Sequence, residues 1–247
     1  MTGEKTHNTG KIRMAEKTLM DASETYGADA VFTSSFGAED MVITHMISSL
    51  NLDIQIATID TGRLPQSTYE LMDNSAQRYG LVLHTYFPDR VSVEDMVREK
   101  GMNLFYRSRE NRKLCCGIRK VEPLGRILKD RKAWITGIRG SQSEFRQSMK
   151  RMEKDESRNI VKYNPLIDWD TEDVWNYIHD NRIEYNRLHD QGYPSIGCEP
   201  CTRAIRPGED ERAGRWWWES DVKECGLHVA ENGDGNTKHE FSPGEVA

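Results

Sequence analysis

The stretch Ala28-Asp-Ala-Val-Phe-Thr33, followed at once by Ser34-Ser-Phe-Gly-Ala-Glu-Asp40, decides the fold class. A short apolar run that ends in small and polar residues predicts a buried strand, a tight loop and then a helix. Small residues in such a loop let backbone N–H groups approach a phosphate, and the start of the helix adds a favourable dipole. The loop is neither a Walker A nor a G-x-G-x-x-G motif. A plain strand-to-helix turn capped by serine is therefore the alternative interpretation.

The same alternation continues along the first two-thirds of the chain. Apolar runs at 53–59, 81–86 and 133–138 predict three further strands, and helical spacing predicts helices at 39–50 and 65–79. Strands separated by helices indicate a parallel α/β sheet. Ligands bind beyond the carboxyl ends of the strands in such a sheet. We therefore expect the functional site in the loops after the first, second and fourth strands.

Length and charge narrow the class of protein. The 247 residues suffice for one domain with a substantial core, and 34 Lys and Arg against 40 Asp and Glu give a net charge of −6. This balance does not favour a general nucleic-acid binder. No apolar stretch approaches the roughly 20 residues of a membrane span, and the polar N-terminus lacks a signal-peptide core. We expect a cytoplasmic protein without a membrane or nucleic-acid partner.

The composition changes near residue 207. A charged, glycine-bearing run at 207–214 precedes Trp216-Trp-Trp218, and residues 232–236 are rich in Gly and Asn. These features predict a nucleotide-binding α/β domain at 1–206 and a mobile C-terminal tail at 207–247. The tryptophans are expected to anchor the tail to the body.

The five cysteines divide into four and one. Cys115 and Cys116 are adjacent, Cys198 and Cys201 form a C-x-x-C, and Cys225 stands alone. Four thiolates suit either a tetrahedral zinc ion or a [4Fe–4S] cluster, and spacing does not choose between them. A fifth thiol with a histidine three residues on is a candidate nucleophile.

Cations accompany these motifs. Residues 115–120 are expected to begin a helix that runs toward Leu128, which places Lys120 over Cys116 and Arg119 over Cys115. The charge-dense run 139–158 is typical of a solvated surface helix. Two arginines at its start, Arg139 and Arg146, would nevertheless suit bidentate recognition of phosphate or sulfate.

Taken together, the motifs resemble the assimilatory adenosine-phosphosulfate reductases of the phosphosulfate reductase family, over residues 28–228. The resemblance implies a Rossmann-like parallel sheet of the adenine-nucleotide α-hydrolase type. Its motifs are S-S-F-G-A-E-D at 34–40, I-D-T-G-R-L at 59–64, C-C-x-I-R-K at 115–120, G-I-R-G-S-Q-S at 137–143, P-L-I-D-W at 165–169, G-C-E-P-C-T at 197–202 and E-C-G-L-H at 224–228.

The resemblance also implies an activity in sulfate assimilation and cysteine biosynthesis. Cys225 would attack the sulfur of adenosine 5′-phosphosulfate, release AMP and carry an S-sulfocysteine that thioredoxin or glutaredoxin discharges as sulfite. The four paired cysteines would bind one [4Fe–4S] cluster, and a homo-oligomer is compatible with the sequence. Implied substrate contacts are Ser34, Ser35, Phe36, Gly37, Ile59, Thr61, Gly62, Arg63, Leu64, Lys120, Gly137, Arg139, Arg146, Arg212, Arg215 and His228.

Three alternatives stay open. Enzymes for the 3′-phosphorylated substrate look similar but typically lack the cysteine pairs, so that activity or a dual-substrate enzyme is the nearest alternative. An ATP-using nucleotidylating or tRNA-thiolating enzyme normally needs an S-G-G-x-D-S loop, which 34–40 is not. A non-catalytic zinc-binding protein would account for the four paired cysteines alone. The family loop G-x-R-R-x-Q-S has glycine at 140 in this chain, which weakens any claim about anion contacts there.

Overall fold

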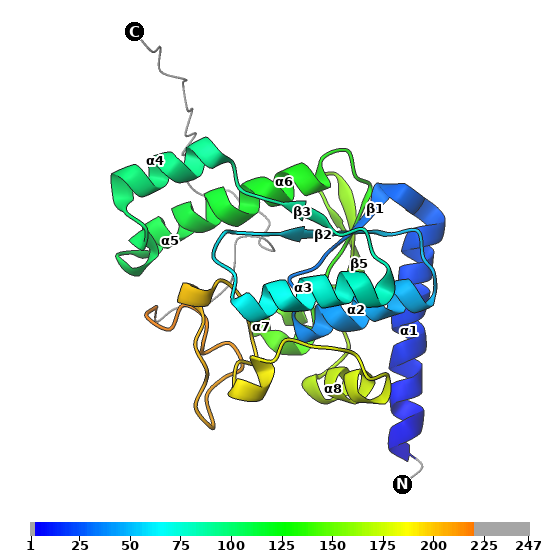
Figure 1. The fold of residues 1–247 in the computed structure, drawn as a ribbon. Helices are drawn as coiled ribbons and strands as arrows, with labels where there is room; N and C mark the ends of the chain where they lie inside the picture. Colours follow the sequence, from blue (N-terminus) through cyan, green and yellow to red (C-terminus); the bar gives the residue numbers. More distant parts are fainter. Residues whose placement is uncertain (1–2, 220–247) are drawn as a thin grey trace.

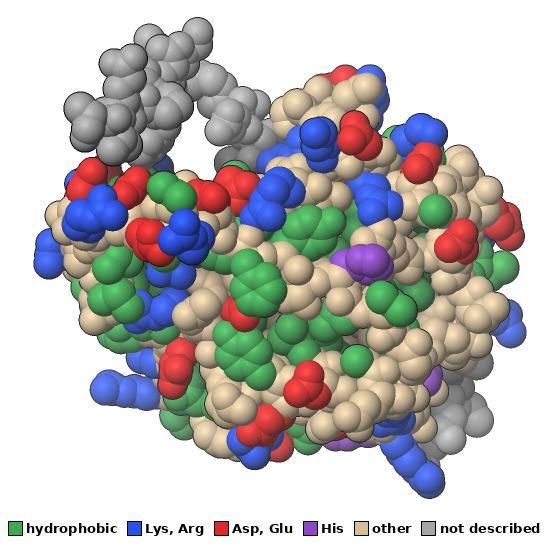
Figure 2. Space-filling view, turned by 45° about the horizontal axis from the view of Figure 1, so that its top comes forward, with side chains coloured by type: hydrophobic (Ala, Val, Ile, Leu, Met, Phe, Trp, Pro, Cys, Tyr) green, Lys and Arg blue, Asp and Glu red, His purple; other side chains and the backbone are tan. Residues whose placement is uncertain are grey.

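The computed structural model describes residues 3–219. The predicted nucleophile Cys225, His228 and the remainder of the expected tail lie outside the described residues. Among the residues described, no helix has both the length and the apolar character needed to cross a membrane. Figure 2 shows acidic and basic side chains interspersed over one face of the molecule.

A six-stranded sheet organises the fold (Figure 1). Its order is β3-β2-β1-β4-β6-β5, with five parallel strands and β5 antiparallel at one edge. The register places Phe32 of β1 beside Ile56 and Ile135. The strands are β1 Ala30–Thr33, β2 Gln55–Ile59, β3 His84–Tyr86, β4 Ala133–Ile135, β5 Met152–Asp155 and β6 Ile160–Tyr163.

The chain reverses its direction across the sheet next to β1. It adds β2 and β3 on one side of β1 and then returns to place β4 on the other side. The loops after β1 and β4 therefore diverge and leave a crevice, which is where parallel α/β sheets bind ligands.

Helices cover both faces of the sheet, because the central strands are apolar on both sides. Ala30, Val31 and Phe32 are completely buried. One face packs against α1, α2, α3 and α8, and the other against α6. The helices are α1 Gly3–Tyr26, α2 Ala38–Ser49, α3 Gln66–Tyr79, α4 Arg90–Lys100, α5 Arg109–Cys116, α6 Glu122–Leu128, α7 Glu144–Gln147 and α8 Thr171–Asp180.

The structure confirms the α/β class and the four predicted strands, with shorter bounds. Helix α1 and strands β5 and β6 were not expected from the sequence. The interpretation of 139–158 as a solvated surface helix is wrong, because this run forms a short 3₁₀ turn, α7 and the edge strand β5. Arg139 and Arg146 within it are buried.

The described part of the expected tail, residues 207–219, packs on the body. Trp216 is 1% exposed, and its backbone N–H donates to Cys201 O at 3.1 Å. The N–H of Arg203 donates to Gly214 O at 3.0 Å. The anchoring role predicted for the tryptophans is therefore confirmed for Trp216, whereas Trp217 is 40% exposed.

Candidate active site

A cavity of about 210 Å³ opens at the crevice where the strand order reverses. The loops after β1, β2 and β4 contribute to its wall, as the sequence predicted. The C-terminal third of the chain adds residues 194–197 together with Glu211, Arg212 and Arg215. The position is the one that this sheet topology favours for ligand binding.

The loop after β1 is shaped by a buried carboxylate. Asp40 Oδ2 accepts hydrogen bonds from Ser35 N at 2.5 Å and Ser35 Oγ at 2.8 Å. Burial raises the pKa of Asp40 to about 6, although the bonds from Ser35 oppose this shift. Gly137, after β4, admits the carboxylate, because a Cβ there would lie only 2.1 Å from Asp40 Oδ1.

Gly137→Ala is expected to cost about 1–3 kcal/mol of folding free energy, the usual range for an overpacked interior. The matched control is Gly125→Ala in α6, where a Cβ would meet no atom within 4 Å. Alanine is the better helix former, so the control should be neutral or stabilised by up to about 1 kcal/mol. Urea unfolding measures both variants. Equal stability of the two would show that the loop yields to the added methyl group.

Four cationic side chains line the cavity, namely Lys120, Arg146, Arg212 and Arg215. Arg215 is 6% exposed, and its Nη1 donates to Ser195 Oγ at 3.3 Å and Ile196 O at 3.2 Å. Gly197 makes room for this guanidinium, since a Cβ at 197 would lie 2.3 Å from Arg215 Nη2. Buried, pre-positioned cations of this kind suit an anionic ligand rich in oxygen atoms.

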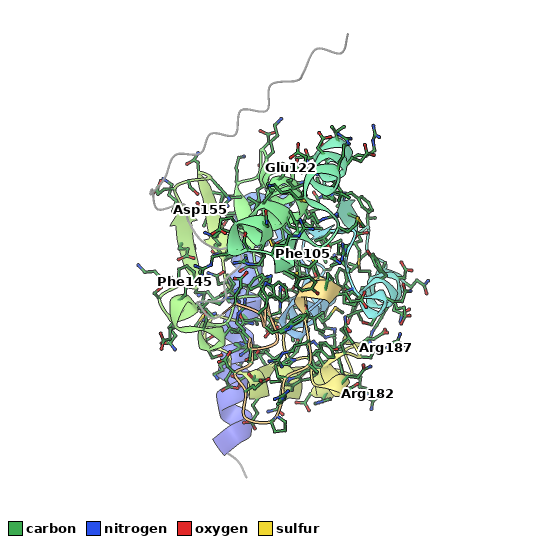
Figure 3. All side chains as sticks on the ribbon, turned by 90° about the vertical axis from the view of Figure 1, so that its left-hand side faces the viewer. Phe105, Glu122, Phe145, Asp155, Arg182 and Arg187 are labelled. Atoms are coloured by element: carbon green, nitrogen blue, oxygen red, sulfur yellow. The ribbon has the colours of Figure 1, made fainter. Side chains whose placement is uncertain are left out.

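The four paired cysteines line a second, smaller cavity of about 20 Å³. Cys115 and Cys116 end α5, whereas Cys198 precedes the short 3₁₀ turn Glu199–Cys201 and Cys201 is its last residue. Apolar side chains including Phe105 and Trp216 pack around them. Figure 3 looks onto this region, with Phe105 between the green helices and the gold segment.

The local structure around Cys115 differs from the prediction. The pair ends a helix instead of starting one, and Gly117–Val121 is a π-helical turn in which Glu122 N donates to Gly117 O. The expected four-residue spacing is therefore wrong here, because a π-turn bonds residues five apart.

The side chains that line the small cavity suit an anionic group bound by sulfur ligands. Arg63, Arg112, Arg119 and Lys120 also line it, which offsets the negative charge of four thiolates. Arg112 is held in place by Glu219, with Nε to Oε1 at 2.6 Å, and lies over the Trp216 ring at 4.5 Å. Soft thiolates suit zinc or iron–sulfur clusters. Within residues 3–219, no three His, Cys, Asp or Glu side chains are grouped to hold a single metal ion.

The two cavities share a wall. Lys120 is the only described residue that lines both. Thr61, in the wall of the larger cavity, shares a hydrogen bond with Cys198, Oγ1 to Sγ at 3.2 Å. Burial opposes ionisation of Cys198, but the charges of Lys120, Arg215 and Arg119 and the Thr61 hydrogen bond together lower the pKa of the thiol. Charge at the cysteines is thus felt at the larger cavity.

Most substrate contacts implied by the sequence converge at the larger cavity, but Phe36, Gly62, Arg63 and Arg139 are absent from its wall. Phe36 is buried in the core, and Arg63 lines the cysteine cavity. Residues on the wall are Ser34, Ser35, Gly37, Ile59, Thr61, Leu64, Lys120, Gly137, Arg146, Arg212 and Arg215.

Gly140, the departure from the family pattern, has a local explanation. A Cβ there would lie 3.0 Å from Ile167 O, to which Gly140 N donates at 2.9 Å. The close approach of the two backbone segments favours glycine at this position.

Sequence reasoning missed several residues of the wall. His189, Gln142, Glu211 and the segment 194–197 line the cavity without having been singled out as ligand contacts. The adjacency of Ser195-Ile-Gly197 to the C-x-x-C motif was the available signal. No signal in the sequence indicated His189, because only the tertiary fold brings this residue to the crevice.

The sheet and its reversal of strand order define an α/β protein of the adenine-nucleotide α-hydrolase type, with a cation-lined cavity at the crevice. Yeast FAD synthetase shares this fold, with a TM-score of 0.58 at 16% identity over 83% of this chain and 69% of that one. The model of the phosphoadenosine phosphosulfate reductase domain matches residues 29–204. The chain belongs to this family of reductases, and the prediction that it is an enzyme is confirmed.

Individual proteins similar to this chain carry the names of reductases of the same family. The chain is 54% identical to adenosine 5′-phosphosulfate reductase of Burkholderia cepacia over 80% of each chain. It is 50% identical to that of Allochromatium vinosum over 81% of this chain and 79% of the relative. A crystal structure of phosphoadenylyl-sulfate reductase from Candida auris in complex with phosphate has a TM-score of 0.66 at 32% identity, over 81% of this chain and 97% of that one.

Proposed function

We propose that this protein reduces adenosine 5′-phosphosulfate to sulfite and AMP. The observation that carries the proposal is the pair of adjoining cavities, one lined by four cations and the other by four cysteines, with Lys120 in the wall of both. Relatives of about the same length that share half of the sequence are named for this substrate.

In the first step, the thiolate of Cys225 attacks the sulfur of the substrate. The bond between sulfur and the bridging phosphate oxygen breaks, AMP leaves and S-sulfocysteine remains. Negative oxygens shield the sulfur, so cations must hold them and stabilise the leaving phosphate. Lys120, Arg146, Arg212 and Arg215 have the charge and the position for this. His228 is proposed as a further contact.

In the second step, a dithiol protein such as thioredoxin or glutaredoxin attacks Cys225 Sγ. Sulfite leaves with the electron pair of the S–S bond, and the second thiol of the dithiol then releases Cys225. The dithiol supplies both electrons. A nucleophile that follows the last strand in the sequence would leave the intermediate accessible to a bulky reductant once the active site opens.

Cys115, Cys116, Cys198 and Cys201 would hold one [4Fe–4S] cluster, whose proposed contribution is an electrostatic field at the substrate. Lys120 would carry that effect across the shared wall while it holds substrate oxygens. Thr61 would support Cys198 through its hydrogen bond.

Metal analysis tests this ligand set. Protein prepared anaerobically is expected to contain about four iron atoms and about four acid-labile sulfide ions per chain, and to absorb at about 400 nm. Cys198→Ser should lose most of both, because the harder oxygen ligand binds iron–sulfur clusters poorly. Stoichiometric zinc without sulfide in a colourless protein would favour the non-catalytic zinc alternative.

The substrate is tested by parallel assays with adenosine 5′-phosphosulfate and its 3′-phosphorylated analogue. We expect sulfite and AMP from the first substrate at a much higher kcat/KM than sulfite from the second. Comparable values would assign the chain to the dual-substrate alternative, and the reverse order to the reductases for the 3′-phosphorylated compound.

A further inference from the structure

Arg139 is a buried connection between three parts of the chain. Its side chain is 1% exposed, and Nε donates to Glu39 Oε1 at 2.7 Å while Nη2 donates to Glu211 Oε1 at 2.7 Å. Nη1 donates to Ser141 Oγ at 2.8 Å and Thr171 Oγ1 at 3.2 Å. Four of its five N–H groups bond to these partners, and Arg139 is absent from the wall of the larger cavity.

Glu211 belongs to the segment that supplies cations to the cavity. It immediately precedes Arg212, and Arg215 follows four residues later. Both arginines line the larger cavity. The backbone bond of Trp216 to Cys201 holds the C-terminal end of this segment on the body. The Arg139–Glu211 ion pair holds its N-terminal end. Between these two attachments, Arg212 and Arg215 have little freedom to leave the cavity.

Arg139 also neutralises acidic groups beside the anion site. Glu39 and Glu211 both line the larger cavity, where free carboxylates would repel a phosphosulfate. The guanidinium lies between them, and their side chains are only 15% and 26% exposed. Ion pairs with this little exposure are weakly screened by salt.

We propose that Arg139 and Glu211 are positioning residues, which latch residues 211–215 over the cavity so that Arg212 and Arg215 meet the anionic part of the substrate. The inference rests on the proposed function for the identity of that substrate. It gives the arginine of the G-I-R-G-S-Q-S motif a role that does not need direct contact with the ligand.

The test compares Glu211→Gln with Glu209→Gln in the full, cluster-loaded protein. Glu209 lies two residues before Glu211. Among the described residues its side chain binds Arg203, at 2.7 Å, and the backbone N–H of Arg206, and not the loops around the sheet. In Glu211→Gln the Arg139 guanidinium keeps its bond to Glu39, so no buried charge is left unpaired. Glu211→Ala serves as a second variant in which the glutamine amide cannot replace the bond.

Calorimetric titration with adenosine 5′-phosphosulfate is done with Cys225→Ser present in every protein, so that no covalent adduct forms. It should show dissociation constants raised about 10-fold by either Glu211 variant, in line with loss of a charge-assisted hydrogen bond. kcat/KM should fall by at least as much as binding weakens, because Arg212 and Arg215 hold substrate oxygens in the ground state and also stabilise the leaving phosphate in the transition state. Backbone amides of residues 211–215 should exchange hydrogen for deuterium faster in the same variants. Glu209→Gln should match the unaltered protein.

Tighter substrate binding by Glu211→Gln would overturn the proposal, because it would mean that Glu211 acts on the ligand chiefly by repulsion. Unchanged binding and exchange would overturn it as well, as would equal effects of the Glu209 and Glu211 variants. If the unaltered protein does not bind the substrate, the proposed function fails. The exchange experiment still decides whether the latch exists, since it needs no ligand.

Discussion

Cys225→Ser is expected to lower sulfite formation by more than about 10³-fold, because a hydroxyl is a far poorer nucleophile than a thiolate and removal of a catalytic nucleophile is among the most costly changes in an enzyme. Incubation of the unaltered protein with adenosine 5′-phosphosulfate and no reductant should add about 80 Da, the mass of one sulfonate on the nucleophile. Peptide mapping should place the adduct on Cys225, and reduced thioredoxin should release it as sulfite.

The serine variant carries its own control. It should keep its iron, its sulfide and its affinity for AMP, because the four paired cysteines and the cavity wall are unchanged. Sulfite production by Cys225→Ser at a rate comparable to that of the unaltered protein would require another nucleophile. The division of the cysteines into four ligands and one nucleophile would then be wrong.

Lys120→Ala has the second-largest expected effect, a decrease of about 10² to 10³ in kcat/KM, equivalent to about 2.7–4 kcal/mol of transition-state stabilisation. The reason is its position in the wall of both cavities, beside the cysteines and facing the anion site. Steady-state kinetics at saturating reductant measure the loss, and the absorbance of the cluster reports whether the fold around it persists.

The matched control is Lys113→Ala, seven residues earlier in α5, where the side chain is exposed. It should reduce kcat/KM less than about twofold, since an exposed surface substitution changes stability and local field little. If Lys120→Ala behaved like this control, Lys120 would have no role in the reaction. Another residue would then have to couple the two cavities.

Local patterns in the sequence predicted what depends on neighbouring residues. The apolar run before Ser34 gave the first strand and its loop, because burial and strand geometry act over a few residues. The ordered motifs indicated the family, which the match over residues 29–204 confirms. The cysteine pairs predicted a shared site because thiols clustered in a chain usually share a ligand, and all four line one cavity.

The helical register of residues 115–121 could not be predicted from the sequence. Four-residue spacing was assumed for Cys116 and Lys120, but the chain inserts a π-turn at Gly117–Val121. Such a turn depends on what surrounds the helix, here a buried Arg119 whose Nη1 donates to Thr61 O at 2.7 Å, as much as on the residues within it. Helical periodicity contains no signal for that contact.

The sequence by itself determined the strands β1 to β4, the loop after β1 and the four-plus-one grouping of the cysteines, since these follow from residue type and short-range spacing. Only the tertiary structure decided that Arg139 binds Glu211, 72 residues away, and that Gly137 receives the Asp40 carboxylate. It likewise decided that Lys120 lies in the wall between the two cavities. The physical reason is that the strand order brings loops from distant parts of the sequence to one crevice. A buried charge there is stable only when it is paired, and its partner comes from another segment of the chain.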